Sequence, residues 1–354
     1  MLEDDFDDVH DSESPEFWRV YFLTLTDPSD PTRDFGLVKV GITKGAVERR
    51  IEHLQTGNPY RIRCEASFES PVARAVECWV HRTRHVEYLE WLRLPRSEIN
   101  ILVEEAKRES ERLARIAQAM ARWSQVESNG KERAPSTGER RLHDEMRGVL
   151  EDLLPTQFQL DLTLSHIALI AGKVRRVPGI IQIRRYEPFK RFKPKLAHEK
   201  FPHLVAAHTA DKVRPHFRPK GLPGVGAPQW ASVRAEAEAS CGKRDELNAA
   251  MLRDADAVAD EGCRTDELAE LHERFLALLQ KKTRLDIDRK DLKAQAIQAT
   301  ENWEVVSGVW SYRRKFQPTF NGKAFREAHR TEAAACSVAG GPFIHRNVFL
   351  SRSY

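Results

Sequence analysis

The sequence predicts an α+β protein: a small domain with an antiparallel three-stranded sheet and flanking helices, followed by a mostly helical C-terminal region. Three observations predict this arrangement. Short apolar runs of changing period fill residues 17–97, whereas longer helical spacing dominates residues 141–354. Residues 98–140 are expected to form a helix followed by a linker, because a polar stretch that bears Pro and Gly, SNGKERAPSTGE, ends this segment. The chain has 354 residues, too many for one ordinary core.

Charge is segregated along the chain although its total is small. The 57 basic and 53 acidic residues give a formal charge of +4. Residues 1–16 contain no Lys or Arg, and this acidic composition predicts a disordered tail. No apolar run approaches the roughly 18 residues of a membrane span. The five cysteines are widely spaced and form no CxxC pair, which is typical of reduced thiols. We expect a cytoplasmic protein without a membrane partner, either monomeric or oligomeric.

The small domain is predicted from alternating strands and helices. Residues 20–26 and 37–40 are rich in β-branched and aromatic side chains, and the turn formers DPSDPTRDFG between them favour a hairpin. Gly41 is expected to end the second strand. GAVERRIEHLQTGNP then has helical spacing, RIRCEASF alternates as a third strand, and VARAVECWVHR predicts another helix.

Helical spacing distinguishes the two adjacent arginines of the first helix. Arg50 lies at the edge of the apolar line, within about 40 to 60° of Val47, whereas Arg49 points away from it. In the next helix, Glu77 and His81 are four residues apart and share one face beside the core. Arg50 is therefore the arginine that can reach a site at the domain edge.

The C-terminal region opens with a short helix that is expected to end near Pro155. The stretch FQLDLTLSHIALIAG after it is ambiguous between strand and helix, so the fold of residues 141–230 stays open. Long helices are expected over residues 230–300, short elements after them, and no internal repeat.

Residues 173–220 carry fourteen Lys or Arg against three Asp or Glu, with aromatic residues between them. This composition suits a surface that meets phosphates with cations and bases with rings. The alternative is a solvated scaffold whose charges pair with acidic helices elsewhere. The residues assigned to nucleic-acid binding are Arg175, Arg176, Arg184, Arg185, Lys190, Arg191, Lys193 and Lys195.

The small domain resembles the GIY-YIG nuclease superfamily, in its phage-type branch. VYF, VKVG, RRI, LQTGNP, ExxxH and EW occur in that order within residues 18–94, less than a quarter of the chain. Two departures affect local packing: Arg84 stands where relatives often carry Phe, and LEWL replaces GEWF. The site residues that the resemblance implies are Tyr21, Lys39 (in place of a second tyrosine), Arg50, Glu77 and His81.

The resemblance implies a divalent-metal-dependent endonuclease acting on DNA, with RNA as a possible substrate. Glu77 would hold Mg²⁺ or Mn²⁺, Arg50 would bind the phosphate, and Tyr21 would take a proton from water. Lys39 would add positive charge, and His81 would orient the water or a phosphate. The context would be phage biology, anti-phage defence or repair, and the C-terminal region would position the nucleic acid. The alternative is a non-catalytic nucleic-acid-binding or assembly protein that uses the small domain for docking.

Overall fold

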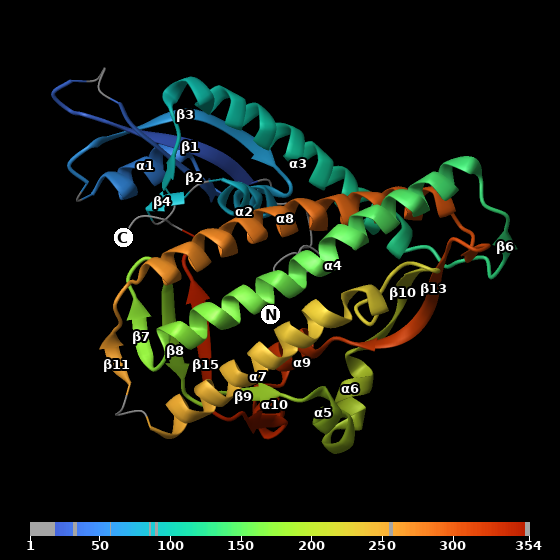
Figure 1. Cartoon of the computed structure of the whole chain (residues 1–354). Helices are drawn as coiled ribbons and strands as arrows, with labels where there is room; N and C mark the ends of the chain where they lie inside the picture. Colours follow the sequence, from blue (N-terminus) through green and yellow to red (C-terminus); the bar gives the residue numbers. More distant parts are fainter. Residues whose placement is uncertain are drawn as a thin grey trace.

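The computed structural model describes residues 18–30, 34–56, 58–84, 86–88, 91–254 and 258–350. The acidic segment 1–16, with its predicted disorder, lies outside the described residues, as do Leu89 and Glu90 of the LEWL motif. The fold is α+β, as the sequence predicts (Figure 1). Within the described ranges, no helix has the length and apolar character needed to cross a bilayer.

Five antiparallel strands form the sheet of the small domain, in the order β3-β1-β2-β5-β4. The three predicted strands are present, and two short strands extend the sheet beyond β2. The strand β2 continues past Gly41 to Thr43, so the prediction that this glycine ends the strand is wrong. The bounds are β1 Trp18–Thr26, β2 Asp34–Thr43, β3 Arg61–Ser70, β4 Val86–Tyr88 and β5 Trp91–Arg93.

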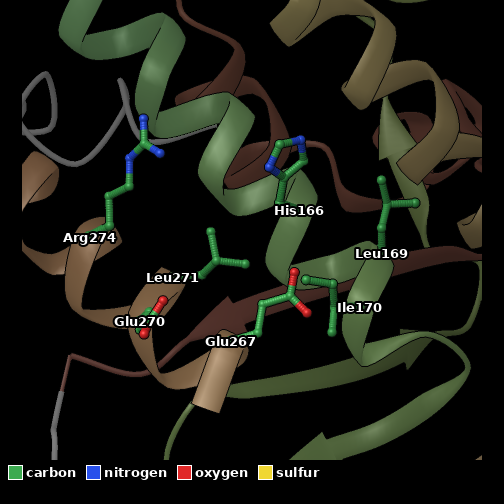
Figure 2. Close-up of a pocket in the computed structure, with 7 residues that line it drawn as sticks. All are labelled: His166, Leu169, Ile170, Glu267, Glu270, Leu271 and Arg274. Carbon is green, nitrogen blue, oxygen red and sulfur yellow. The ribbon is translucent and has the colours of Figure 1, made fainter. Parts of the chain in front are cut away.

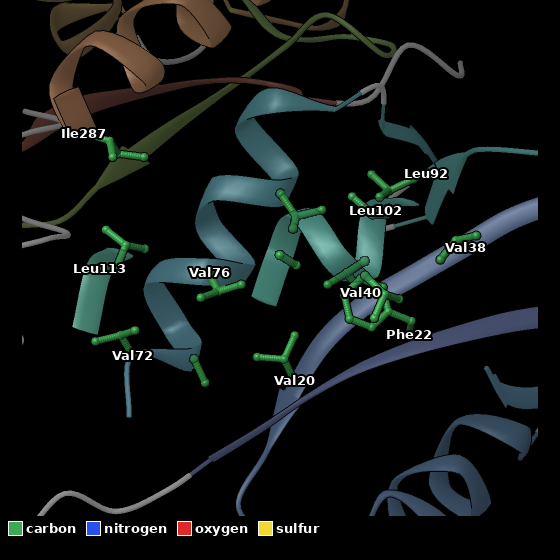
Figure 3. Packing of buried hydrophobic residues seen from close by; sticks show 14 of the residues in the cluster. Val20, Phe22, Val38, Val40, Val72, Val76, Leu92, Leu102, Leu113 and Ile287 are labelled. Atoms are coloured by element: carbon green, nitrogen blue, oxygen red, sulfur yellow. The ribbon is translucent and has the colours of Figure 1, made fainter. Parts of the chain in front are cut away.

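Helices cover both faces of this sheet because successive strand residues point to opposite sides. Val20 and Phe22 of β1 pack toward α2 (Ala73–Thr83) and α3 (Arg96–Ser124), as Figure 3 shows. Tyr21, Leu23 and Leu25 form a second cluster with α1 (Val47–Gln55). Tyr21 and Arg50 therefore lie on the α1 side, and Glu77 and His81 approach from the other side.

The C-terminal region combines long helices with small sheets. The helix α4 runs without a break through Pro155, so the prediction of a helix end there is wrong. The ambiguous stretch FQLDLTLSHIALIAG, residues 158–172, is helical through Ala171. The helices are α4 Thr137–Ala171, α5 Pro194–Lys200, α6 Pro202–Ala207, α7 Ala231–Arg253, α8 Asp266–Thr300, α9 Gly322–Ala328 and α10 Arg330–Ala335, with the 3₁₀ helix η2 Pro228–Trp230.

Ten strands complete this region, and the basic segment 173–220 supplies four of them. The segment expected as a linker also packs, since Asn129 donates its backbone N–H to the Asn302 carbonyl at 2.8 Å. The strands are β6 Glu132–Arg133, β7 Val174–Val177, β8 Ile181–Tyr186, β9 Lys190–Phe192, β10 Thr209–Pro219, β11 Ala259–Glu261, β12 Val305–Val306, β13 Trp310–Phe320, β14 Ser337–Ala339 and β15 Phe343–Val348.

The element order of the C-terminal region occurs twice, which corrects the expectation of no internal repeat. The helices α4 and α8 have 35 residues each, and each is followed by a strand hairpin and two short helices. The strand β6 pairs in parallel with β12 as β11 does with β7. The first repeat's β10 and β8 pair with the second repeat's β13 and β15. Each repeat thus completes the sheets of the other.

Individual contacts match between the repeats at an offset of 129 residues. His143 of α4 and His272 of α8 each place Nε2 at 2.7 Å from a backbone carbonyl, of Lys220 and Phe349 respectively. Both long helices are followed by a residue with positive φ, at Gly172 and Glu301. The agreement of buried hydrogen bonds and backbone conformation indicates an internal duplication.

Candidate active site

Tyr21 is the centre of the site that the resemblance implies. It lies on β1, is 1 % exposed, and faces Gly41 across the β1–β2 pair. A Cβ atom at Gly41 would lie 2.6 Å from Cζ of Tyr21, closer than real Cβ contacts allow. A glycine inside a strand often marks such a close approach. Gly41 therefore makes room for the tyrosine ring to lie across β2.

Arg50 meets Tyr21 from the helix on the same side of the sheet. Buried Val47 anchors α1 to this face, and Arg50 donates from Nε to Oη of Tyr21 at 3.3 Å. The Arg50 side chain is exposed, so its guanidinium lies between the buried hydroxyl and solvent. Arg49 is also exposed, but its position on α1 is turned from this contact. The structure thus pairs Tyr21 with the arginine that the helical spacing favours.

Lys39 shares the face of Tyr21 because it lies two residues before Gly41 on β2. It is 7 % exposed and stands opposite Leu23 on β1 and Trp91 on β5. A lysine is rarely buried to this extent. Its ammonium group therefore places positive charge on the same sheet face as the tyrosine and Arg50.

Glu77 and His81 lie on α2, across the sheet from α1. Nε2 of His81 is 3.1 Å from the carbonyl oxygen of Val40, and a carbonyl can only accept, so Nε2 carries the proton. This bond orients the imidazole against β2. Glu77 is half-buried one turn earlier on the same helix. The structure thus brings Tyr21, Lys39 and Arg50 to one face of the sheet, whereas Glu77 and His81 lie on the helix that covers the other face.

Arg84, the departure from the family pattern, joins helices of the domain. It forms an ion pair with Glu105 of α3 and lies over the Trp79 ring at 5.9 Å. Burial, and then the positive charge of Arg284, lowers the pKa of Arg84. Arg84 therefore packs between α2 and α3, on the face of the sheet opposite α1.

The resemblance implies a divalent metal ion, and the arrangement of possible ligands bears on which ion the site could hold. In the parts of the chain that the structure describes, no three His, Cys, Asp or Glu side chains group as metal ligands. That pattern disagrees with a closed zinc site. Mg²⁺ does not require such a group, because it keeps several waters and uses one or two carboxylates with substrate phosphates. Glu77 is the carboxylate that the resemblance implies as its protein ligand.

The predicted nucleic-acid-binding residues lie apart from this site. Figure 1 shows β7, β8 and β9 on the opposite side of α4 and α8 from the small domain. Hollows on this surface are lined by Arg175, Arg176, Arg184 and Arg185, and by Lys190 and Arg191. Ion pairs join Arg175 to Asp260 at 3.4 Å, Arg176 to Glu261 at 3.9 Å, Arg185 to Glu187 at 3.3 Å and Lys195 to Glu199 at 4.0 Å.

These ion pairs bear on the two interpretations of the basic segment. The partners of Arg175 and Arg176 come from β11, so part of the charge is paired, as the scaffold alternative expects. Both carboxylates are exposed, however, and exposed pairs contribute only about 0 to 1 kcal/mol. Such weak pairs leave the cations able to exchange partners with phosphate.

A further hollow with polar side chains lies between α4 and α8 (Figure 2). Figure 2 shows its lining from the two helices only, with His166 on one and Glu267, Glu270 and Arg274 on the other. Ser240 lies 3.5 Å from Nε2 of His166. The Ser240–His166 contact is at the outer limit of a hydrogen bond, and within the described residues these side chains do not group as metal ligands, so this hollow resembles a packing groove between the repeats.

Comparison with protein-family models, curated proteins and solved structures found no match to this chain.

Proposed function

We propose that this protein is a divalent-metal-dependent endonuclease that hydrolyses phosphodiester bonds in DNA. The hydrogen bond from Arg50 to Tyr21, made possible by Gly41, is the observation that carries the proposal. It unites a phosphate-binding group and a proton acceptor from separate elements. The GIY-YIG resemblance supplies the family in which such a pair acts on phosphodiesters.

In the proposed mechanism, the Arg50 guanidinium binds the phosphate with a planar, permanently charged fork. Because it covers the buried Tyr21 hydroxyl, its movement onto phosphate opens that oxygen to a water molecule. Tyr21, acting as its phenolate, then accepts the proton of the water while the water oxygen bonds to phosphorus and the P–O bond to the leaving strand breaks. Lys39 offsets negative charge from the same sheet face, and His81 holds α2 against β2. Glu77 would hold Mg²⁺ or Mn²⁺, which supplies positive charge for the phosphate oxygens. Because α2 lies across the sheet from Tyr21 and Arg50, the proposal requires a phosphate that reaches both groups.

The test is nicking of supercoiled plasmid with Mg²⁺ or Mn²⁺. We expect Glu77→Gln to abolish nicking, with Glu111→Gln, an exposed glutamate of α3, as its control. Arg50→Ala should lower the rate at least 100-fold, about 2.7 kcal/mol of transition-state stabilisation, and Arg49→Ala should change it less than threefold. Full activity of folded Glu77→Gln would refute the assignment.

The rival is a non-catalytic nucleic-acid-binding or assembly protein. The burial of Tyr21 and Lys39 and the use of His81 by the backbone favour it, since these are structural roles. It predicts salt-sensitive binding of DNA that the same substitutions leave unchanged, with no metal-dependent product. Plasmid, single-stranded DNA and RNA tested in parallel separate the two functions and identify the substrate.

A further inference from the structure

The strands β10 and β13 form a two-stranded ribbon whose faces differ in chemistry. Eleven cross-strand pairs join them without a register shift, from Thr209–Phe320 to Pro219–Trp310. On one face, Trp310 and Tyr312 are buried and Phe217 packs with them. This buried end fixes the register, because a slip of one residue would exchange the faces.

The other face of the ribbon is basic and exposed. Three register pairs build it: Lys212 with Gln317, Arg214 with Lys315, and His216 with Arg313. Arg218 extends the row, which spans about 20 Å at 3.3 Å per residue. We define the basic ribbon face by its cationic and titratable members, all exposed: Lys212, Arg214, His216, Arg218, Arg313 and Lys315.

Few of these charges are neutralised within the protein. Across the described ranges, Arg313 is the member of this face with a carboxylate partner, Glu304 at 3.1 Å. Arg214 donates to the Thr319 hydroxyl at 3.2 Å. Like charges held along two strands repel one another unless a polyanion compensates them. The face therefore favours a ligand with regularly spaced negative charge.

The absence of aromatic residues on this face selects among polyanions. The register places Phe217, Tyr312 and Phe316 on the opposite face, leaving His216 as the one ring among the basic residues. Single-stranded nucleic acids bind by stacking bases on aromatic rings. A B-form major groove, about 12 Å wide, admits a two-stranded ribbon, whereas the A-form major groove of RNA is deep and narrow.

We propose that the basic ribbon face binds double-stranded DNA through its phosphates. The inference rests on the proposed function in one respect, because it names the surface that positions DNA for that enzyme. The helix α3 links the two parts: it leaves the small domain at Arg96, and its Trp123 ring lies 5.2 Å from the Arg314 guanidinium of β13. DNA on the ribbon would thus be held at a fixed distance from Tyr21.

The duplication provides a comparison surface. The strands β8 and β15 are the second repeat of this ribbon, and Arg184 opposite His345 matches Arg313 opposite His216. There, however, Tyr186 stacks on Phe343 at 5.2 Å, where the first ribbon carries cations. The two related surfaces have therefore diverged, and only the first is uniformly basic.

The test is fluorescence anisotropy of a labelled 20-base-pair DNA duplex, without divalent metal and in the Glu77→Gln background. We expect the triple variant Lys212→Gln, Arg214→Gln, Lys315→Gln to weaken binding at least tenfold at about 150 mM salt. The slope of log K against log salt should fall by about 2.7, at 0.9 per phosphate. Single-stranded DNA and duplex RNA of the same sequence should bind the unmutated ribbon at least tenfold more weakly than the DNA duplex.

Two comparison variants make the result specific. Arg108→Gln, Arg140→Gln, Lys243→Gln removes three exposed cations elsewhere and should change the affinity less than twofold. Arg184→Gln, Arg185→Gln, Lys190→Gln alters the β8–β9 surface; if it alone abolishes duplex binding, the ribbon assignment is overturned. Equal binding of duplex RNA, or ribbon-dependent binding of a polyglutamate peptide but not of DNA, would also overturn it.

A measurement on the unmutated protein tests the proposal without depending on whether a variant folds correctly. Bound duplex should protect Lys212 and Lys315 from acetylation, and unchanged acetylation would contradict the proposal. Because no arm requires cleavage, ribbon binding without nicking would refute the nuclease alone. Nicking with ribbon-independent binding would refute the ribbon alone.

Discussion

At the scale of single residues, Gly41 is the position where a methyl group should matter most. Its Cβ would lie 2.6 Å from Cζ of Tyr21, so Gly41→Ala must displace the ring or spread the strands. We expect a loss of about 1 to 3 kcal/mol in the free energy of unfolding, as in other overpacked cores, and loss of nicking. Gly45→Ala is the control, since its Cβ would meet only the Thr43 hydroxyl at 4.0 Å. Equal stabilities in urea titrations would contradict the close approach.

The site illustrates which residues a sequence can identify. Arg50 follows from helical spacing alone, because its relation to Val47 is local. The role of Gly41 depends on Tyr21 from another strand, so the sequence could show only a glycine after an apolar run. The use of His81 by the Val40 carbonyl is equally non-local. Cross-strand and helix–sheet contacts of this kind require the fold.

Glu109 at the α3–α8 contact predicts a pH dependence. Arg112 donates to Asp288 at 2.7 Å and to Asp291 at 3.0 Å, and Glu109 lies 3.9 Å away with 13 % of its side chain exposed. Burial, with repulsion from the two aspartates, raises the pKa of Glu109 despite the attraction of Arg112. The charged form is therefore disfavoured in the folded state.

The sign of the effect follows from proton linkage. With a raised folded pKa, the native state binds more protons than the unfolded chain, so this group's stabilising contribution falls as pH rises above about 4.5. We expect Glu109→Gln to be more stable than the unaltered protein at pH 7, with the difference disappearing near pH 4. Chemical denaturation at both pH values measures it. Lower stability of the glutamine variant at pH 7 would mean that the attraction between Arg112 and the Glu109 carboxylate outweighs the cost of burying that charge.

At the scale of elements, Pro155 in α4 is the clearest conflict between sequence and structure. Proline cannot donate to the Glu151 carbonyl and usually breaks a helix, at a cost of about 3 kcal/mol. The helix continues because packing holds both halves, with Leu153 and Phe158 buried on either side. The matching position in α8 is Arg284. Tertiary packing thus outweighs local propensity, which sequence periodicity cannot anticipate.

Pro155→Ala should therefore stabilise the protein by up to about 3 kcal/mol, because it restores a helical hydrogen bond. Gly148→Ala in the same helix is the comparison, expected to gain only about 0.5 to 1 kcal/mol from backbone entropy. Thermal and urea denaturation should rank the variants in that order. A destabilised Pro155→Ala would indicate that α4 needs a bend at this point.

The duplication also concerns whole elements, and there is a physical reason why the sequence alone does not reveal it. The repeats share buried histidines, positive-φ positions and strand pairing, but these constrain few residue identities. The small domain was more predictable, because the apolar run of β1 and the alternation of β3 are local patterns that reflect burial directly. Contacts between the two repeats, by contrast, produce no periodic pattern within either local sequence.

At the scale of the whole molecule, the helix α8 takes part in two hydrophobic cores. Its Ile287 and Ala294 pack into the small-domain cluster with β1, α2 and α3, as Figure 3 shows for Ile287. Its Phe275 and Leu279 belong to the cluster with α4 and β8. A helix that completes two cores couples their stabilities. The small domain and the duplicated region should therefore unfold together.

Ile287→Ala tests this coupling, because the side chain is 3 % exposed. A buried isoleucine cut to alanine costs about 2 to 5 kcal/mol, so the free energy of unfolding should fall by that amount. Ile101→Ala, on α3 and 58 % exposed, should cost less than about 0.5 kcal/mol. Native-state hydrogen exchange should show equal loss of protection in β1 and in α4. If only β1 loses protection, α8 packs against the small domain without joining the two parts into one cooperative unit.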